Sequence, residues 1–320
     1  MERILVTGAL GQIGSELTAQ LRHRYGGENV FATDKRDECP ANMVETGPFE
    51  SVDCLSPAQI KQAVSQYRID TIYHLAALLS AVAEARPLLA WDVNINGLLN
   101  VLEVARVYNC AVFVPSSIGA FGPGTPPDNT PQETIQRPTT VYGISKVAGE
   151  LLCDYYFTRF SVDTRGLRYP GIISNVTLPG GGTTDYAVEI FYQAIKKKRY
   201  TCYLEPDTRL DMMYMPDAIR AAIEIMEADS KKLVHRNAFN LTAMSFTPQE
   251  LSQEIGKHIP DFVMEYQVDP VRQAIADSWP NKLDDSAARQ EWGWSPKYDL
   301  SKMTADMLKV LAERVARGEL

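Results

Sequence analysis

A glycine-rich turn that directly follows a short apolar run constrains the fold of this chain most strongly. Ile4-Leu5-Val6 is followed by Thr7-Gly8-Ala9-Leu10-Gly11-Gln12-Ile13-Gly14. The apolar run predicts a buried strand, and residues 13–25 carry apolar side chains at helical spacing. Glycines at such a junction let the backbone approach a phosphate, which the free N–H groups of the helix N-terminus can bind. We therefore expect a strand, turn and helix that hold a dinucleotide, with Gly8, Gly11, Gln12 and Ile13 as candidate contacts.

Strands and helices alternate through the first half of the chain. Further strands are predicted at residues 29–34, 52–54, 71–76, 111–117 and 163–169, and helices at residues 56–67, 88–108 and 141–160. Ser56 and Pro57 are a good N-cap and first-turn residue for the first of these helices. Alternation of this kind implies right-handed crossovers and a parallel sheet that is covered on both faces. The expected fold class is α/β, with a doubly wound parallel sheet of the Rossmann type.

The pattern changes after Tyr169, where proline and glycine become frequent. A helix is expected at residues 184–197, and a strand-turn followed by a helix at residues 211–228. A further strand and a capped helix that starts at Thr247-Pro248 come after these. We expect a second, smaller and discontinuous substrate lobe. The predicted division gives residues 1–169 plus about 211–235 to the dinucleotide-binding domain, and about 170–210 plus 236–320 to the substrate lobe.

The totals for the 320 residues exclude several classes of protein. The formal net charge is -8 and there is no long basic run, which argues against nucleic-acid binding. The five cysteines are scattered and the four histidines show no ligand spacing, so we predict no metal and a reduced, cytoplasmic location. The chain starts directly with a strand and has no apolar run of bilayer-spanning length, so we expect neither a signal peptide nor a membrane partner.

Two acidic residues after predicted strands are candidate cofactor ligands. Asp34 lies twenty residues beyond Gly14, where a carboxylate can accept both ribose hydroxyls and would repel a 2′-phosphate. This favours NAD over NADP, although Lys35 and Arg36 beside it could hold a phosphate, which leaves residual NADP use open. Asp53 could bond the adenine amino group or could equally be a turn residue at a strand end.

The catalytic candidates are Ser117, Tyr142 and Lys146. Tyr142 and Lys146 are four residues apart on a predicted helix and so share a face. An ammonium and a cofactor with a positively charged nicotinamide both stabilise a phenolate, which can then act as a base. Lys146 can also bond the nicotinamide ribose. Ser117 ends a predicted strand, where its hydroxyl can hold a substrate oxygen.

These motifs resemble those of the extended short-chain dehydrogenase/reductase superfamily over essentially the whole chain. The resemblance includes the glycine turn, His74-Leu75-Ala76-Ala77, Asn94-x-Asn96-Gly97, Ser116-Ser117 with Phe121-Gly122, and Tyr142-x-x-x-Lys146. It implies that Ser117, Tyr142 and Lys146 form the catalytic triad. It also implies that Leu75, Ala76, Ala77, Asn94, Tyr169 and Ile172 line the cofactor.

Several separated segments are similar to the short-chain type of L-threonine 3-dehydrogenase. They are residues 115–122, 168–174, 179–187 and 277–280. This resemblance implies that Ser80, Thr184 and Asp185 contact the substrate together with Ser117 and Tyr142. Asp185 could bond the substrate ammonium or order its loop, and Thr183-Thr184-Asp185 is also a good helix N-cap. Gly180, Gly181 and Gly182 could let the loop close or only make a turn, and Trp279 could cover the site or belong to the core.

The expected activity is oxidation of the β-hydroxyl of L-threonine to 2-amino-3-ketobutyrate, with hydride transfer to NAD. A small zwitterion suits short polar groups, whereas a nucleotide sugar needs cations for its diphosphate, and the second lobe offers few beyond residues 196–199. The alternative is an NAD-dependent sugar-nucleotide epimerase or dehydratase. A binding protein that senses a dinucleotide would not need the Ser117, Tyr142 and Lys146 set. A homodimer through helices near residues 88–108 and 141–160 is possible.

Overall fold

The central element of the computed structural model, which describes residues 1–177 and 182–319, is a seven-stranded parallel sheet. Its strand order is β10-β6-β5-β4-β1-β2-β3, and each neighbouring pair is parallel. The strands are β1 (Ile4–Thr7), β2 (Val30–Asp34), β3 (Phe49–Ser51), β4 (Thr71–His74), β5 (Ala111–Ser117), β6 (Thr164–Tyr169) and β10 (Phe239–Asn240). The order reverses between β1 and β4, so a ligand crevice is expected at the carboxyl ends of these two strands. The predicted Rossmann-type fold class is confirmed.

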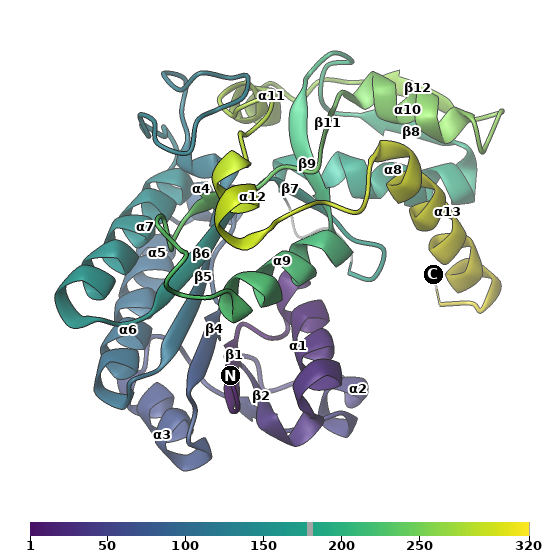
Figure 1. Ribbon diagram of the computed structural model, residues 1–320. Coiled ribbons are helices and arrows are strands. Elements are labelled where there is room, and N and C mark those ends of the chain that lie inside the picture. Colours follow the sequence, from purple (N-terminus) through teal and green to yellow (C-terminus); the bar gives the residue numbers. More distant parts are fainter. Residues whose placement is uncertain (178–181, 320) are drawn as a thin grey trace.

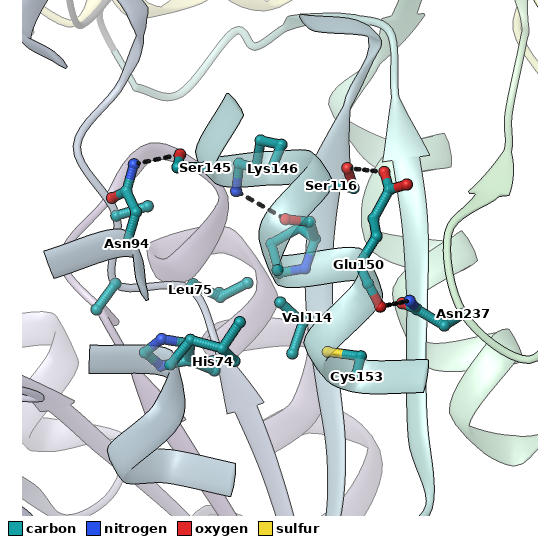
Figure 2. Close-up of a pocket in the computed structure, with 15 residues that line it drawn as sticks. His74, Leu75, Asn94, Val114, Ser116, Ser145, Lys146, Glu150, Cys153 and Asn237 are labelled. Atoms are coloured by element: carbon teal, nitrogen blue, oxygen red, sulfur yellow. Dashed lines mark hydrogen bonds between the residues drawn. The ribbon is translucent and has the colours of Figure 1, made fainter. Parts of the chain in front are cut away.

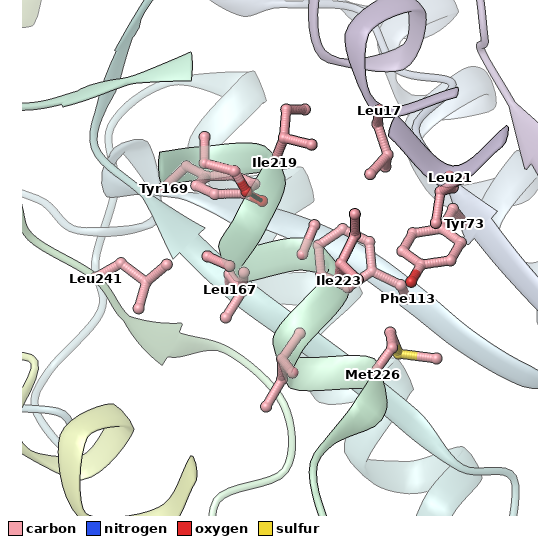
Figure 3. Close-up of a cluster of buried hydrophobic side chains, with 14 of the residues drawn as sticks. Leu17, Leu21, Tyr73, Phe113, Leu167, Tyr169, Ile219, Ile223, Met226 and Leu241 are labelled. Atoms are coloured by element: carbon pink, nitrogen blue, oxygen red, sulfur yellow. Dashed lines mark hydrogen bonds between the residues drawn. The ribbon is translucent and has the colours of Figure 1, made fainter. Parts of the chain in front are cut away.

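Helices cover both faces of this sheet because successive side chains of a buried strand point in opposite directions. Ile4 and Val6 of β1 pack with α1 (Gln12–Tyr25) and α9 (Met215–Glu227) in one buried cluster. Leu5 lies in a second cluster on the opposite face with α3 (Pro57–Tyr67), α6 (Gly97–Tyr108) and α7 (Val141–Phe160). Figure 3 shows the first cluster, in which Leu17 and Leu21 of α1 and Ile219, Ile223 and Met226 of α9 face Tyr73, Phe113 and Leu167 of the sheet.

A smaller part of the chain forms its own core beside the carboxyl ends of the strands (Figure 1). It contains a three-stranded sheet of order β11-β9-β7 and a two-stranded sheet of β12 and β8. Its elements are β7 (Gly171–Ile173), α8 (Tyr186–Lys197), β8 (Arg199–Cys202), β9 (Leu210–Tyr214), β11 (Met244–Phe246), α10 (Pro248–Gly256), β12 (Val263–Tyr266), α11 (Pro270–Asp277) and α13 (Leu300–Ala316).

The remaining helical segments are short and connect the main elements. They are η1 (Gly27–Asn29), α2 (Ala41–Glu45), α4 (Ser80–Ala85), α5 (Pro87–Trp91), η2 (Asp92–Asn96), η3 (Ile118–Ala120), η4 (Thr183–Asp185) and α12 (Ser286–Trp292). Across residues 1–177 and 182–319, no helix combines the length and the apolarity needed to cross a bilayer.

Two predicted helices are confirmed closely. The predicted helix at residues 141–160 is α7 (Val141–Phe160). The predicted helix at residues 56–67 is α3, and the Ser56 hydroxyl caps it by accepting a hydrogen bond from the Gln59 backbone N–H at 3.4 Å. Local capping signals therefore located these helices correctly.

The predicted strand at residues 52–54 is wrong by three residues, because the strand is β3 at Phe49–Ser51. Asp53 forms a turn instead: its carboxylate accepts from the Leu55 N–H at 2.9 Å and its carbonyl accepts from the Ser56 N–H at 2.9 Å. The tendency of Asp to bond the backbone two residues on outweighs the apolar character of its neighbours.

The predicted helix at residues 88–108 is not continuous. It consists of α5, a π-helical turn at η2 (Asp92–Asn96), and α6. Within this turn the Asn94 side chain leaves the helix to bond the backbone of Leu78 and the hydroxyl of Ser145. Single π turns inside helices are frequent at functional sites, and a tertiary contact of this kind has no local sequence signal.

The predicted domain boundary differs from the structure near residue 236. Phe239 and Asn240 form β10, which pairs with β6 at the edge of the central sheet. Ala287 and Ala288 of α12 also pack in the main core, as does Trp294. The sequence pattern does not predict this place for β10, because its pairing partner β6 lies 72 residues earlier in the chain and leaves no local signal.

Candidate active site

The glycine-rich turn between β1 and α1 is shaped so that larger residues would not fit. Gly8 has a φ of +70°, and a Cβ there would lie 2.6 Å from the backbone N of Ala76. A Cβ on Gly14 would lie 2.2 Å from the carbonyl oxygen of Gly8. The first N–H groups of α1 have no partner within the helix and carry its positive dipole end. A cavity lies at the carboxyl ends of β1, β4 and β5 and is called the main cavity below; its lining includes Gly8, Gly11, Gln12 and Ile13. The turn therefore fits a bound pyrophosphate.

Asp34 lies at the end of β2 and is joined to the glycine turn, because its carboxylate accepts from the Leu10 backbone N–H at 3.1 Å. The Arg36 guanidinium donates to both of its oxygens, at 3.0 and 3.1 Å. Burial acts to raise the pKa of this carboxyl, but the pairing with Arg36 prevails and holds the pKa below its ordinary value. Asp34 is therefore an ionised group at the place expected for a ribose ligand, although it does not line the main cavity.

The segment after β4 separates the main cavity from a smaller one behind it. Leu75 and Ala77 line both cavities, whereas Ala76 and Asn94 line only the smaller cavity (Figure 2). The Asn94 carboxamide pairs with Leu78 in both directions, at 2.8 and 3.1 Å, and donates to Ser145 at 3.1 Å. Asn94 thus fastens the loop after β4 to α7.

Asp53, the other candidate for the cofactor, lies outside both cavities. Its carboxylate is engaged in the turn to Leu55. Of its two expected roles, the turn is the one that the structure displays.

Ser117, Tyr142 and Lys146 meet at the main cavity, as the sequence predicted. The Lys146 ammonium lies 5.5 Å from the centroid of the Tyr142 ring and donates to the carbonyl oxygen of Pro115 at 2.8 Å. The Ser117 hydroxyl accepts from the Gly119 N–H at 3.1 Å. A Cβ on Gly119 would lie 3.2 Å from the Tyr142 ring, so the absence of a side chain there lets the ring pack closely.

The remaining wall of the main cavity comes from the smaller part of the chain, from α4 and from the end of β6. It includes Ser80, Tyr169, Ile172, Thr184 and Asp185. The Asp185 carboxylate accepts from the Gly182 N–H at 2.6 Å, so it orders its loop as well as facing the cavity. Gly180 and Gly181 lie outside the described residues.

Trp279 lines the same cavity and is partly buried. It also packs against a cluster of Ile118, Phe121 and Leu283. Both expected roles of this tryptophan, cavity wall and core residue, are therefore present together.

Two titratable groups near the site, His74 and Glu150, were given no role by the sequence pattern. His74 is buried and shares a hydrogen bond of 2.8 Å with the Thr7 hydroxyl. Burial and then the charge of Lys146 lower its pKa to about 3, so it stays neutral. Glu150 is buried in the wall of the smaller cavity. Its place four residues after Lys146 was the available signal, because it continues one helix face from Tyr142.

This arrangement can carry out acid–base chemistry on a polar substrate beside a dinucleotide. A phenol, a hydroxyl and an ammonium converge on one wall, while a carboxylate and hydroxyls face them. Among the described residues that line this cavity, Lys146 is the one cation. A phenol that is buried beside an ammonium is suited to take a proton from an alcohol.

Comparisons with known proteins give consistent results. Residues 4–241 match the NAD dependent epimerase/dehydratase family. A protein from Staphylococcus haemolyticus named as an uncharacterized epimerase/dehydratase is 59% identical over 98% of this chain and 99% of its own length. The structure of L-threonine dehydrogenase from Clostridium difficile is 57% identical, with a TM-score of 0.96 and 98% of each chain covered. The holo form of a GalE-like L-threonine dehydrogenase from Cupriavidus necator is 49% identical, with a TM-score of 0.94 over 97% of this chain and 99% of that chain.

Proposed function

The chain belongs to the NAD-dependent epimerase/dehydratase family, whose cofactor is NAD, and from this premise we propose that it oxidises the β-hydroxyl of L-threonine to 2-amino-3-ketobutyrate. The observation that carries the proposal is a single cavity that is lined by Ser117, Tyr142 and Lys146, by Thr184 and Asp185, and by the glycine turn. Two solved structures at 57% and 49% identity over nearly the whole chain are described as L-threonine dehydrogenases, which supports the same substrate.

In the proposed reaction, Tyr142 as phenolate takes the proton of the substrate hydroxyl while the Ser117 hydroxyl holds its oxygen. When bound, NAD would supply the two-electron oxidant, as acceptor of the hydride from the β-carbon, for conversion of the alcohol to a ketone. The Lys146 ammonium favours the phenolate electrostatically and is held in place by the Pro115 carbonyl. We also propose that Lys146 bonds the nicotinamide ribose.

The cofactor would lie along the carboxyl ends of β1, β2 and β4. We propose that Gly8, Gly11, Gln12 and Ile13 receive the pyrophosphate and that Asp34 receives the adenosine ribose. The remainder of the cofactor would be flanked by Leu75, Ala76, Ala77, Asn94, Tyr169 and Ile172. Asp53 stays a candidate for contact with the adenine. The tight packing of Gly8 against Ala76 and of Gly14 against the Gly8 carbonyl supports this placement, since only glycine lets the turn close so near the start of α1.

The proposed substrate contacts are Ser80, Thr184 and Asp185, which lie in the same cavity as Ser117 and Tyr142. A carboxylate in this wall suits the ammonium of an amino acid. A nucleotide sugar would require cations for its diphosphate. Because Lys146 is the one cation among the described residues of this lining, the cavity favours a small zwitterion over a nucleotide sugar.

The decisive assay is a spectrophotometric screen for NADH with NAD and, in parallel, L-threonine, D-threonine, L-serine and a nucleotide sugar. We expect NADH to form with L-threonine. With the Tyr142→Phe variant, NAD binding should persist while turnover near neutral pH falls by about 100-fold or more, the usual contribution of a general base. Full turnover in this variant would remove Tyr142 from the mechanism.

The same screen tests the alternative of a sugar-nucleotide epimerase or dehydratase. An epimerase regenerates its NAD in each cycle, so it would convert the nucleotide sugar without release of NADH. Conversion of the nucleotide sugar with no response to L-threonine would overturn the proposed substrate.

We also propose that two copies of the chain associate in the cytoplasm. Apolar side chains of α5 and α7 are exposed on one surface, with Leu88 83%, Leu151 64% and Tyr155 53% exposed. Exposed apolar side chains on two helices that contact each other are suited to an interface in which helices of two copies pack together. The five cysteines are all unpaired, as is usual in a reducing compartment.

A further inference from the structure

The feature that carries a further inference is a buried ion pair directly behind the proposed catalytic residues. The Glu150 carboxylate on α7 accepts from the Arg168 guanidinium on β6 at 3.0 and 2.8 Å. The side chains are 5% and 8% exposed, respectively. Removal of two charges from water is unfavourable unless their hydrogen-bonding capacity is satisfied. An interaction of this kind is therefore poor evidence for stability alone, and its geometry needs another explanation.

Both members of the pair are fully engaged, and their partners come from separate segments. Glu150 also accepts from the Ser116 hydroxyl on β5 and from the Gln136 side chain at 2.9 Å. Arg168 donates further to the Gln132 carbonyl at 2.9 Å and to the Asn240 side chain on β10 at 3.1 Å. One buried network thus joins α7 to three strands of the central sheet and to the loop before α7.

This network ends on the residues that carry the proposed chemistry. Tyr142, Lys146 and Glu150 follow one another at intervals of four on the same face of α7. Ser116 lies between Pro115, whose carbonyl holds the Lys146 ammonium, and Ser117 in the main cavity. Figure 2 shows Lys146, Ser116 and Glu150 around the smaller cavity, with the Glu150 carboxylate turned toward Ser116.

We propose that Glu150, held by Arg168, is a positioning residue for the reaction, which fixes the end of β5 against α7 and keeps the charge beside Lys146 balanced. This inference rests on the proposed function in one respect, because it takes Ser117, Tyr142 and Lys146 as the catalytic groups. The link from Ser116 to Glu150 sets where Ser117 and the Pro115 carbonyl lie relative to Tyr142 and Lys146. The pairing with Arg168 makes the net charge of the network zero.

The other titratable groups around the network define the electrostatic background. They are Lys146, Cys153 and Asp154 from α7, His74 from β4 and Glu133 from the loop before α7. His74 is neutral, and burial raises the pKa of the Cys153 thiol, so it stays protonated. Burial also raises the pKa of the Asp154 carboxyl. Few other buried charges therefore mask the effect that a change in charge at Glu150 has on Lys146 and Tyr142.

The first test is the Glu150→Gln variant, which leaves the Arg168 guanidinium without its carboxylate. Two helical turns separate Glu150 from Tyr142, about 12 Å along the axis. Loss of the Glu150 negative charge at about this distance favours the phenolate by about one pH unit. We expect the acid limb of the pH–rate profile to move down by about that amount and kcat to fall about tenfold, with KM for NAD nearly unchanged. A lower kcat with an unmoved acid limb would overturn the electrostatic role.

The Glu150→Gln/Arg168→Met double variant restores a neutral network and should return the acid limb to its wild-type position. The matched control is Asp163→Asn. Asp163, just before β6, pairs with buried Arg165 at 2.8 Å and with Arg236 at 2.6 Å, and Arg165 bonds α9 and lines neither cavity. The control removes the same charge and should leave the pH–rate profile in place. An equal displacement in this control would show that the effect is not specific to Glu150.

The Ser116→Ala variant tests the positioning role without disturbing the ion pair, and it serves if Glu150→Gln does not fold. We expect kcat to fall about threefold to tenfold with an unchanged pH–rate profile and unchanged affinity for NAD. An unaltered kcat would overturn the positioning role.

Failure of the proposed function can be distinguished from failure of this inference. The ionisation of Tyr142 is measured without substrate, from the ultraviolet difference spectrum between each protein and its Tyr142→Phe counterpart. A downward shift of this titration in Glu150→Gln supports the inference even if L-threonine is not the substrate. An unshifted titration overturns it even if L-threonine is oxidised.

Discussion

Asp211 should make the stability of this protein depend on pH in an unusual direction. Its side chain is only 1% exposed at the start of β9. Burial raises the pKa of its carboxyl from 3.8 to about 7, although hydrogen bonds from the Leu283 N–H at 2.8 Å and the Thr242 hydroxyl at 2.7 Å oppose the change. A carboxyl whose pKa is raised on folding stabilises the fold below its unfolded pKa and loses this contribution as the pH rises through the folded pKa.

The size of the effect follows from the two pKa values. The whole difference between 3.8 and about 7 corresponds to about 4 kcal/mol, and the part that falls between pH 5 and pH 8 is about 2 to 3 kcal/mol. In Asp211→Asn the carboxamide oxygen can accept from Leu283 while its NH2 group donates to the Thr242 oxygen, so the contacts are kept without the charge. The variant should therefore gain about 2 to 3 kcal/mol relative to the wild type as the pH rises from 5 to 8.

Urea denaturation of both proteins at several pH values measures this difference directly. Other titrating groups are common to the two proteins, so they cancel in the comparison. Asp163→Asn is the control: burial acts to raise the pKa of Asp163, but the pairing with Arg165 prevails and lowers it. That carboxyl is ionised throughout this range, and the offset from the wild type should be constant. Parallel curves for Asp211→Asn and the wild type would refute the reasoning.

Two further predictions follow from single contacts. Asp34→Ser releases Arg36 from its bidentate ion pair, so the guanidinium can bind a 2′-phosphate. We expect fluorescence titration to show that the ratio of the dissociation constants for NADP and NAD falls at least tenfold. An unchanged ratio would contradict the proposed place of the ribose. Leu151→Glu places a charge on the exposed apolar surface of α7. Sedimentation should then show a monomer at concentrations where the wild type is a dimer. A wild type that is itself monomeric would refute the proposed association.

The sequence predicted the main elements well where the signal was local. The apolar strands of the first half, the capped helix α3 and the whole of α7 were located from residues within each segment. The sequence also placed Ser117, Tyr142 and Lys146 together, because a strand end and a helix face bring them to one cavity at the same edge of a parallel sheet.

The errors share a cause, which is contact between segments that are distant in sequence. The bonds from Asn94 to Leu78 and Ser145 opened a π turn, and β10 joined the sheet through β6. The displacement of β3 is the exception, because the turn at Asp53 is made with residues only two and three positions later. Glu150 escaped notice because its partners, Ser116 and Arg168, lie on two different strands. None of these interactions leaves a periodic pattern in the chain.

The chain by itself determined that a dinucleotide fold forms, because glycines at a strand-to-helix junction and alternating apolar segments restrict the backbone locally wherever they occur. It also determined which side chains have the chemistry of a base and its activator. Only the tertiary structure decided that Glu150 and Arg168 neutralise one another, since their burial against each other requires α7 to pack on β6. Electrostatic energy depends on distance through space and on exclusion of water, and neither quantity is defined until the chain is folded.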